Sequence, residues 1–197
     1  MAVSSSVDIC NIALNMIGES LVTSITGSED KQVILNLLYY PVLDQALRKH
    51  SWSFAMHRQA LSSDAGDNLT IYDYKYQLPV DPYCVKPVCL LDSNNQEVDR
   101  ETYPFLEEER YLYTDVASAK LKYVKRITDA TQFDSTFVLY FAAYLAKEIA
   151  FRLTDDMVMA NRMEQKAELF YREARWHDTE ESYVEESPAY WEEAKDQ

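Results

Sequence analysis

Glycine is scarce in this chain: only three of its 197 residues are glycine. The phosphate-binding motifs GxGxxG and GxxxxGK(S/T) are absent, and so is the GxSxG motif around a nucleophilic serine. The first two bind phosphates through backbone amides, and the third exposes a serine at a strained turn. The sequence therefore argues against the familiar nucleotide enzymes and against a serine hydrolase with a nucleophile elbow.

Cysteine is also rare, and the three cysteines have no CxxC spacing: they are Cys10, Cys84 and Cys89. An odd number of cysteines among apolar neighbours is typical of buried thiols in a reducing compartment. The histidines lack the HExxH spacing of a zinc enzyme, and we interpret them as surface or boundary residues: His50, His57 and His177. We expect no metal site, no cofactor and no catalytic residue.

Long hydrophobic runs are missing as well. None approaches the ~18 residues of a transmembrane helix, and the first six residues lack the basic and apolar blocks of a secretion signal. We therefore expect a soluble protein that makes no membrane contact and stays in the cytoplasm where it is made. Its length suits one domain with an insert.

Basic residues are outnumbered by acidic ones, 19 to 33, which gives a net charge of −14. Proteins that wrap nucleic acid neutralise phosphates with clustered lysine and arginine, so this chain is not expected to bind DNA in that way. An acidic wall would instead let DNA slide past. Half of the net charge lies in residues 178–197, where eight acidic residues face one lysine.

Helical periodicity marks both ends of the chain. Residues 7–17 form one expected helix, capped by a serine at 4–6 and stopped by Gly18. A second helix opens at 28–30, and we expect it to kink or break near Tyr40 because Pro41 lacks the amide of a helix interior. It resumes over 42–49.

Two more helices are expected after residue 130. Asp134 or Thr131 caps a long one through Leu153, whose apolar residues surround much of its circumference and include Phe137 and Phe141. Thr154 opens the last one, which ends near His177.

The middle of the chain has the period of β-strands instead. Strands are expected over 54–61, 70–78, 85–91, 111–114 and 120–125, five or six in all. Pro87 predicts an edge or a bulge. The fold class is therefore α+β: a mainly helical bundle (1–50 and 131–177), an inserted small antiparallel β segment (51–130) and an extended acidic tail (178–197).

Aromatic and basic residues supply the candidate contact sites. Tyr72, Tyr74 and Tyr76 suit a protein interface, although they equally suit the core face of a small sheet. Lys120 and Lys122 are best explained as protection of an exposed strand edge; contact with an acidic strip on a neighbouring subunit, or single-stranded nucleic acid, are the alternatives.

The tail combines acidic residues with large aromatic ones, Tyr183, Tyr190 and Trp191. Such a segment favours docking onto another surface over a purely solubilising role. The run 107–109 of three glutamates is read as a solvated turn, with a divalent cation site as the alternative.

Four stretches, in this order and spacing, resemble the head-to-tail adaptors of tailed bacteriophages, the group that includes tail tubular protein A of short-tailed phages. They are residues 8–18 (DICNIALNMIG), 38–60 (LYYPVLDQALRKHSWSFAMHRQA), 76–91 (YQLPVDPYCVKPVCLL) and 123–154 (YVKRITDATQFDSTFVLYFAAYLAKEIAFRLT). Pro41, Leu47, Trp52 and Phe54 match the helix-to-strand junction of that family. Thr128 and Asp129 match its approach to the long helix.

The resemblance implies a twelve-subunit ring between the portal and the tail nozzle or tube, with DNA passing through the lumen without sequence-specific binding. It implies assembly in the host cytoplasm, a final location at the head–tail junction of the virion, and no enzymatic activity. A phage assembly chaperone or general interaction module is the second interpretation. A carbohydrate-active hydrolase is the third, because paired carboxylates can arise among so many acidic residues.

Overall fold

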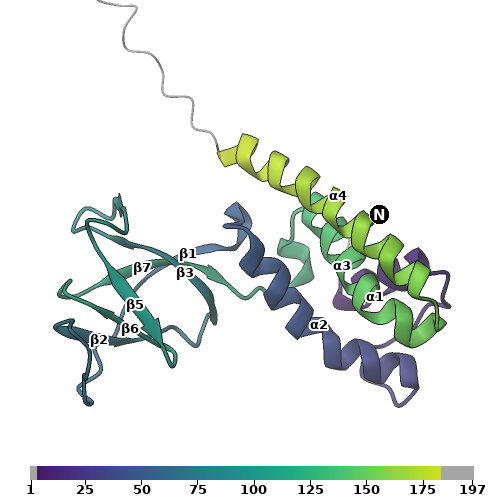
Figure 1. Ribbon diagram of the computed structural model, residues 1–197, viewed down its shortest axis with the longest axis horizontal. Coiled ribbons are helices and arrows are strands. Elements are labelled where there is room, and N and C mark those ends of the chain that lie inside the picture. The colour runs from purple at the N-terminus through teal and green to yellow at the C-terminus, as the bar shows by residue number, and fades with distance from the viewer. Residues whose placement is uncertain (1–3, 183–197) are drawn as a thin grey trace, which may run out of the picture.

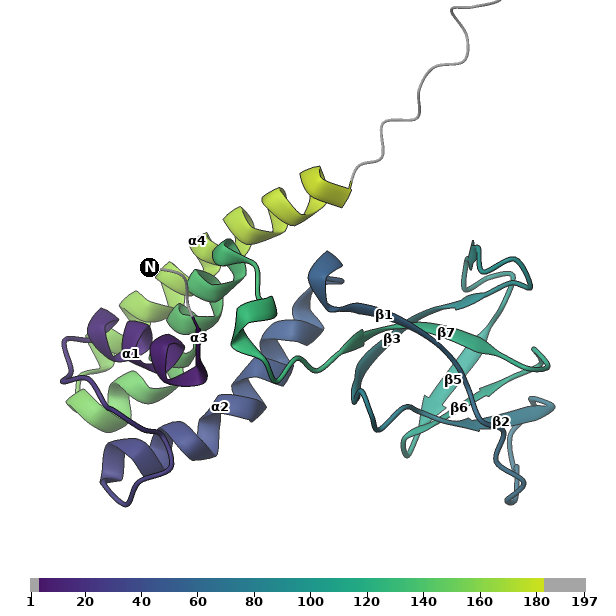
Figure 2. The same ribbon diagram turned by 180° about the vertical axis from the view of Figure 1, so that it is seen from behind.

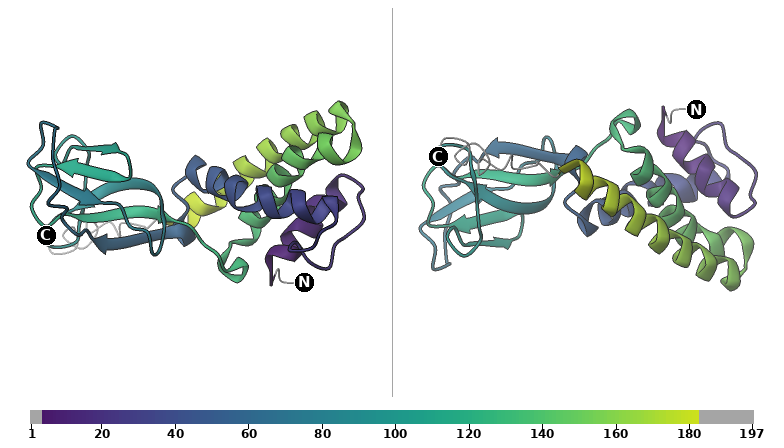
Figure 3. Two further views of the ribbon diagram at one scale, coloured as in Figure 1. Left: turned by 90° about the horizontal axis from the view of Figure 1, so that it is seen from below. Right: turned by 90° about the horizontal axis from the view of Figure 1, so that it is seen from above.

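The computed structural model describes residues 4–182, the last two by their backbone alone. The molecule is elongated and has two lobes, with α-helices at one end and β-sheets at the other (Figure 1, Figure 3). The helices are α1 (Ser6–Met16), α2 (Asp30–Lys49), α3 (Ser135–Thr154) and α4 (Met157–Ser182). The strands are β1 (Met56–Ala60), β2 (Tyr74–Gln77), β3 (Cys84–Leu91), β4 (Glu97–Val98), β5 (Phe105–Glu108), β6 (Tyr111–Thr114) and β7 (Lys120–Lys125). The predicted α+β class is confirmed.

The first helix begins and ends as its sequence predicts. Ser5 is the N-cap: its hydroxyl accepts a hydrogen bond from the Asp8 amide, and the Asp8 carboxylate accepts one from the Ser5 amide. This reciprocal pair satisfies two amides that a helix start leaves without partners. Gly18 follows the helix with a φ of +77°, a conformation that glycine adopts without strain.

Of the kink or break predicted near Tyr40, a break does not occur, because α2 runs without interruption through Pro41. Proline removes the hydrogen bond to the carbonyl of residue 37. Leu37 and Pro41 are both exposed, so that carbonyl lies on the side of the helix that water reaches. Meanwhile Tyr39 and Leu43 are buried against the bundle, and this packing favours the continuous helix.

The long helix α3 is the centre of the bundle, since it contacts each of the other three α-helices. Its N-cap is Asp134, whose carboxylate accepts hydrogen bonds from the amides of Thr136 and Phe137. Phe137 and Phe141 are fully buried, and so are several alanines between them and Ala150. Small side chains at these positions let the neighbouring helices approach closely.

The β lobe is inserted between α2 and α3, and both connections pass through one junction beside the end of α2 (Figure 2). One antiparallel sheet has the order β1-β7-β3-β4, and the other has the order β2-β6-β5. The lobe has a core of its own, which includes Leu90, Phe105, Leu112 and Leu121. Register shifts in β3 on both sides of Pro87 confirm the predicted bulge.

Several strand limits differ from the predicted ones. The described residues form seven strands rather than five or six. Residues 53–55 form a short 3-10 helix, so β1 starts only at Met56. Residues 70–73 belong to a loop, and β2 starts only at Tyr74. Hydrogen bonds between the Asn68 side chain and the loop backbone compete with strand pairing there.

An aromatic cluster fixes the junction between the lobes. Trp52 is 1% exposed, its ring centroid lies 5.0 Å from that of Phe137, and its indole Nε1 donates to the Ala46 carbonyl at 3.1 Å. Phe54 is half-buried against the same Phe137 ring, with centroids 4.9 Å apart. Asp129 lies at the other connection, where its carboxylate accepts from the Thr131 amide and caps a short 3-10 helix.

The end of α4 also reaches this junction, which corrects the predicted boundary at residue 178. The helix extends five residues beyond His177, and Asp178 is buried rather than part of an extended tail. Its carboxylate accepts hydrogen bonds from the Ser53 amide at 2.8 Å and the Ser53 hydroxyl at 2.6 Å. The other carboxylate oxygen lies 3.1 Å from His50 Nε2. Asp178 thereby joins the last helix to the segment that connects α2 with β1.

We predict that Asp178→Ala lowers the free energy of unfolding by about 1–3 kcal/mol, because it leaves a part-buried amide and hydroxyl of Ser53 without their acceptor. Asp178→Asn, which keeps one acceptor oxygen, should cost less. Urea unfolding gives the stabilities, and hydrogen exchange at the Ser53 amide should accelerate. Glu180→Ala is the matched control because Glu180 is exposed one half-turn further along the helix. Equal effects at 178 and 180 would contradict this role.

Candidate interaction surfaces

The most exposed large apolar side chains lie on a loop of the β lobe. Leu69 is 96% exposed and Ile71 is 92% exposed. Their loop is held by its own polar groups: the Asn68 side chain accepts from the Thr70 amide at 3.0 Å and donates to the Tyr72 carbonyl at 2.6 Å. These bonds form an ordered turn that presents both aliphatic side chains to solvent. We call Leu69 and Ile71 the apolar loop tip.

The apolar loop tip was not predicted from the sequence, because the tyrosine alternation that starts at Tyr72 is typical of a strand. A signal was available, since the turn-forming Asn68 and Thr70 alternate with the aliphatic Leu69 and Ile71.

The three candidate tyrosines are not equivalent. Tyr72 is half-buried in the loop, and Tyr74 is exposed at the start of β2. Tyr76 is a core residue, and its assignment to an interface was wrong. It is 2% exposed, its hydroxyl donates to the Val116 carbonyl at 2.9 Å, and the same hydroxyl accepts from the Ala119 amide. Side chains two residues apart point to the same side of a strand, so Tyr74 and Tyr76 are expected on one face of β2. Only Tyr76 is covered by the rest of the β lobe.

The two candidate lysines do not protect a strand edge, so that interpretation was wrong. Both lie on β7, which pairs with β1 on one side and β3 on the other. Lys120 donates to the Asn95 side chain at 2.7 Å, and Lys122 forms an ion pair with Glu97 at 2.5 Å. Alternating lysines on this strand mark the solvent face of a central strand, and they attach the β4 region to the sheet.

The tail candidates Tyr183, Tyr190 and Trp191 lie outside the described residues. The three consecutive glutamates were predicted to form a solvated turn. Glu107 and Glu108 instead belong to β5, and only the third lies in the turn after it. Glu109 in that turn has a φ of +50°. Within residues 4–182 no group of three or more His, Cys, Asp or Glu side chains is arranged to hold a metal ion.

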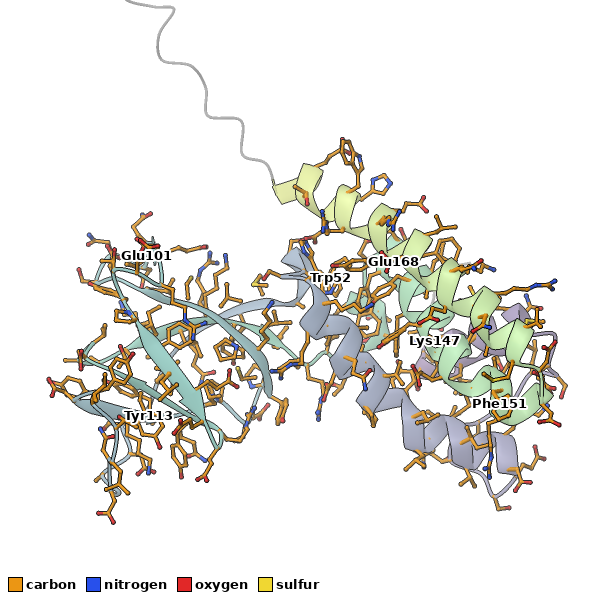
Figure 4. All side chains as sticks on the ribbon, in the orientation of Figure 1. Trp52, Glu101, Tyr113, Lys147, Phe151 and Glu168 are labelled. Carbon is orange, nitrogen blue, oxygen red and sulfur yellow. The ribbon has the colours of Figure 1, made fainter. Side chains whose placement is uncertain are left out.

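A groove runs along α4: one part of it is also lined by α3 and the end of α2, whereas the other part is lined by α4 alone. It consists of two adjoining hollows, of about 470 and 460 Å³, which share Glu168 and Arg172. Figure 4 places Lys147 and Glu168 at this α3–α4 boundary. Its lining includes Lys49, Tyr144, Lys147, Leu169, Arg172 and Trp176. We call this surface the α4 groove.

Tyrosine rings surround one cation at the end of the groove. Lys49 Nζ lies 5.0 Å from the ring centroid of Tyr144, 5.3 Å from that of Tyr171 and 6.0 Å from that of Tyr140. Such contacts stabilise a cation through the negative faces of the rings. Burial raises the pKa of the Tyr140 hydroxyl above its ordinary value, so the ring remains neutral. Tyr171 also donates to the Lys49 carbonyl at 3.3 Å. The end of α2 is thereby fixed against α4.

Ion pairs occupy the middle of the groove. Lys147 pairs with Glu164 at 3.1 Å, and Arg172 pairs with Glu168 at 3.2 Å. Burial alone lowers the pKa of Lys147, but its hydrogen bond to Glu164 and the nearby carboxylates outweigh that effect, and the pKa is raised. Leu169 and Trp176, one helical repeat of seven residues apart, add exposed apolar area beside these pairs. The groove therefore combines aromatic and basic groups.

Exposed apolar side chains also form a stripe on α2. Val33, Leu37 and Tyr40 are exposed at spacings of four and three residues, which places them on one face of the helix. The neighbouring Ile34 and Leu38 are partly buried against the bundle, and the fully buried face of α2 carries Leu35, Tyr39 and Leu43. Both faces are apolar, so the pattern alone did not identify the buried one.

No model of a known protein family matches this chain, and a comparison with curated proteins also finds no match. Among the described residues, no helix combines the length and the apolar character needed to cross a membrane.

Proposed function

We propose that this protein is a structural virion protein: a head-to-tail adaptor of a tailed bacteriophage, one subunit of a ring between the portal and the tail nozzle or tube. The observation that carries the proposal is the distribution of exposed apolar surface over both lobes of an elongated molecule. The apolar loop tip lies on the β lobe, whereas the exposed α2 residues Val33, Leu37 and Tyr40 and the α4 groove lie on the helical lobe. The two lobes form opposite ends of the molecule (Figure 1). A subunit that contacts several neighbours at once needs separate surfaces of this kind.

The family resemblance supports the same proposal. Its second stretch, residues 38–60, spans the end of α2, the buried Trp52 and strand β1. Its fourth stretch, residues 123–154, spans the return from β7 through Asp129 to the end of α3. The resemblance therefore rests on residues that build the two connections between the lobes. Similar connections in a family are a reason to expect a similar subunit shape.

The charge is also compatible with a DNA conduit. A net charge of −14 disfavours adhesion of phosphates to the protein, and DNA that moves through a ring must not bind to its wall. The portal, the tail nozzle or tube and eleven further copies of this chain are the partners that the proposal names.

Electron microscopy of the full-length protein, alone and mixed with the portal protein of the same phage, tests the proposal. Rings, formed alone or on the portal, are the expected result, and the protein should be present in purified virions. A protein that binds during assembly and is missing from finished particles would instead be an assembly chaperone. Turnover of a polysaccharide that one carboxylate substitution abolishes would favour the hydrolase and overturn the proposal.

The apolar loop tip gives this test a specific variant. We predict that Leu69→Ser combined with Ile71→Ser changes the free energy of unfolding by less than about 0.5 kcal/mol, because both side chains are already in water. The same variant should reduce the fraction of protein found in rings or on portals by about tenfold, the effect of losing roughly 1.4 kcal/mol of contact energy. Val80→Ser is the control, since Val80 is an exposed aliphatic residue of the same lobe outside the loop. Unchanged ring formation would show that the apolar loop tip contacts neither a neighbouring subunit nor the portal.

A further inference from the structure

We propose that the α4 groove is the docking site for residues 183–197 of a second copy of this chain. The inference goes beyond the proposed function, because it names a particular contact between copies. It requires that copies meet, as they do in the proposed ring, and it does not require the portal.

The groove offers cationic groups in a strongly acidic protein. Lys49, Lys147, Arg172 and Arg175 lie along it against only Glu164 and Glu168, so its side chains sum to 4 − 2 = +2. Lys147 and Arg172 are paired with the two glutamates. Within the described part of the chain, the side chains of Lys49 and Arg175 form no ion pair. Arg175, and Lys49 beside its tyrosine rings, therefore both lack a carboxylate partner among the described residues, and an acidic ligand could supply one.

The groove also offers apolar and aromatic area between these cations. Leu169 is 64% exposed and shares one hollow with Tyr144, and Trp176 is 65% exposed and shares the other hollow with Tyr171. A peptide that filled the groove would bury these side chains, and aromatic anchors beside basic groups are the residues that dominate protein contacts.

Residues 183–197, YVEESPAYWEEAKDQ, have the complementary composition. They contain five acidic residues and one lysine, which sum to −4, together with Tyr183, Tyr190 and Trp191. Acidic groups suit the two available cations, and the aromatic groups suit the apolar lining. The match of charge and of aromatic content is what identifies this segment as the occupant.

Chain length favours a second copy over the same one. Leu169 lies 182 − 169 = 13 residues before Ser182, the last residue of α4, which is about 20 Å along the helix axis. To occupy its own groove, the segment would have to run back along its own helix over that distance. A neighbouring copy has no such restriction.

Cross-linking of the full-length protein tests the contact. Trp191 is replaced by the photoreactive residue benzoylphenylalanine, and equal amounts of ¹⁴N-labelled and ¹⁵N-labelled protein are mixed before irradiation. We expect cross-linked peptides from α4 around Leu169 and Trp176, with about half of them joining a light and a heavy chain, as random pairing of two copies requires. Cross-links without mixed isotopes would show docking within one chain and overturn the proposal. Cross-links elsewhere, or none, would also overturn it.

A charge-reversed groove supplies the matched comparison. Arg172→Glu with Arg175→Glu should reduce the cross-links about tenfold. Arg152→Glu with Arg162→Glu makes the same change in net charge at exposed positions outside the groove and should leave the yield unchanged. Equal losses in both variants would overturn the groove as the site. Rings that form normally while the groove variant loses its cross-links would support both proposals, whereas cross-links in a protein that forms no rings would overturn only the adaptor function.

Discussion

Replacing Trp52 with alanine is expected to lower the free energy of unfolding by about 4 kcal/mol, the cost of truncating a large buried aromatic side chain. Trp52, on the connection from α2 to β1, is 1% exposed and packs against the rings of Phe137 and Tyr140 of α3. The truncation removes these contacts, leaves a cavity, and takes the hydrogen bond donor away from the Ala46 carbonyl. A loss of this size is a large part of the stability of most domains.

Urea unfolding monitored by circular dichroism measures this change. Trp52→Phe should fall between alanine and the unchanged protein, because it retains an aromatic ring but not the indole donor. Trp176→Ala is the matched control, since the same residue type at an exposed position should cost less than about 0.5 kcal/mol. A loss below about 1.5 kcal/mol at Trp52 would mean that this aromatic cluster does not stabilise the junction.

The helices at both ends were predictable because their signals are local. A capping serine before α1 and the capping Asp134 before α3 act within four residues of themselves. The uninterrupted α2 was not predictable, because the cost of Pro41 is local whereas the packing of Tyr39 and Leu43 that offsets it comes from other helices.

The sheet was predictable as a set of strands but not as an arrangement. The limits of β6 and β7 agree with the sequence pattern, whereas the central place of β7 depends on pairing with β1 and β3, far away in the sequence. The lysines of β7 alternate because one face of the sheet is in water, and the same alternation suits an edge strand. A sequence pattern shows which face of a strand meets water more readily than it shows which strands lie beside it.

The end of α4 was predicted too early, near His177 rather than Ser182, for a different reason. The acidic composition after residue 177 suggested an extended tail, yet the helical spacing of Phe170 and Ala174 continues to Asp178. A carboxylate at a buried helix position is unusual unless a partner satisfies it, and the partner, Ser53, lies 125 residues earlier. The contact was therefore invisible to any local pattern, although the periodicity was a usable signal.

Raising the pH is expected to destabilise this protein through two of its cysteines. Burial raises the pKa of the Cys10 thiol to about 12 and that of the Cys84 thiol to about 12. In an unfolded chain a cysteine ionises near pH 8.5. Both thiols thus favour the folded state fully below about pH 8.5, and this contribution is lost as the pH rises toward 12, because only the unfolded chain releases the protons.

The expected loss between pH 7 and pH 10 is about 2 kcal/mol per thiol, or roughly 4 kcal/mol for the pair, from a slope of 1.36 kcal/mol per pH unit above the unfolded pKa. Urea unfolding at both pH values under a reducing agent measures it. Cys10→Ala with Cys84→Ala should lower stability at pH 7 but show a much smaller fall at pH 10, whereas Cys89→Ala, at a half-buried position, should retain most of the fall. The comparison between variants separates the thiols from tyrosines and lysines, which titrate in all of them. A double variant whose stability falls as steeply with pH as that of the unchanged protein would show that these buried thiols ionise without unfolding.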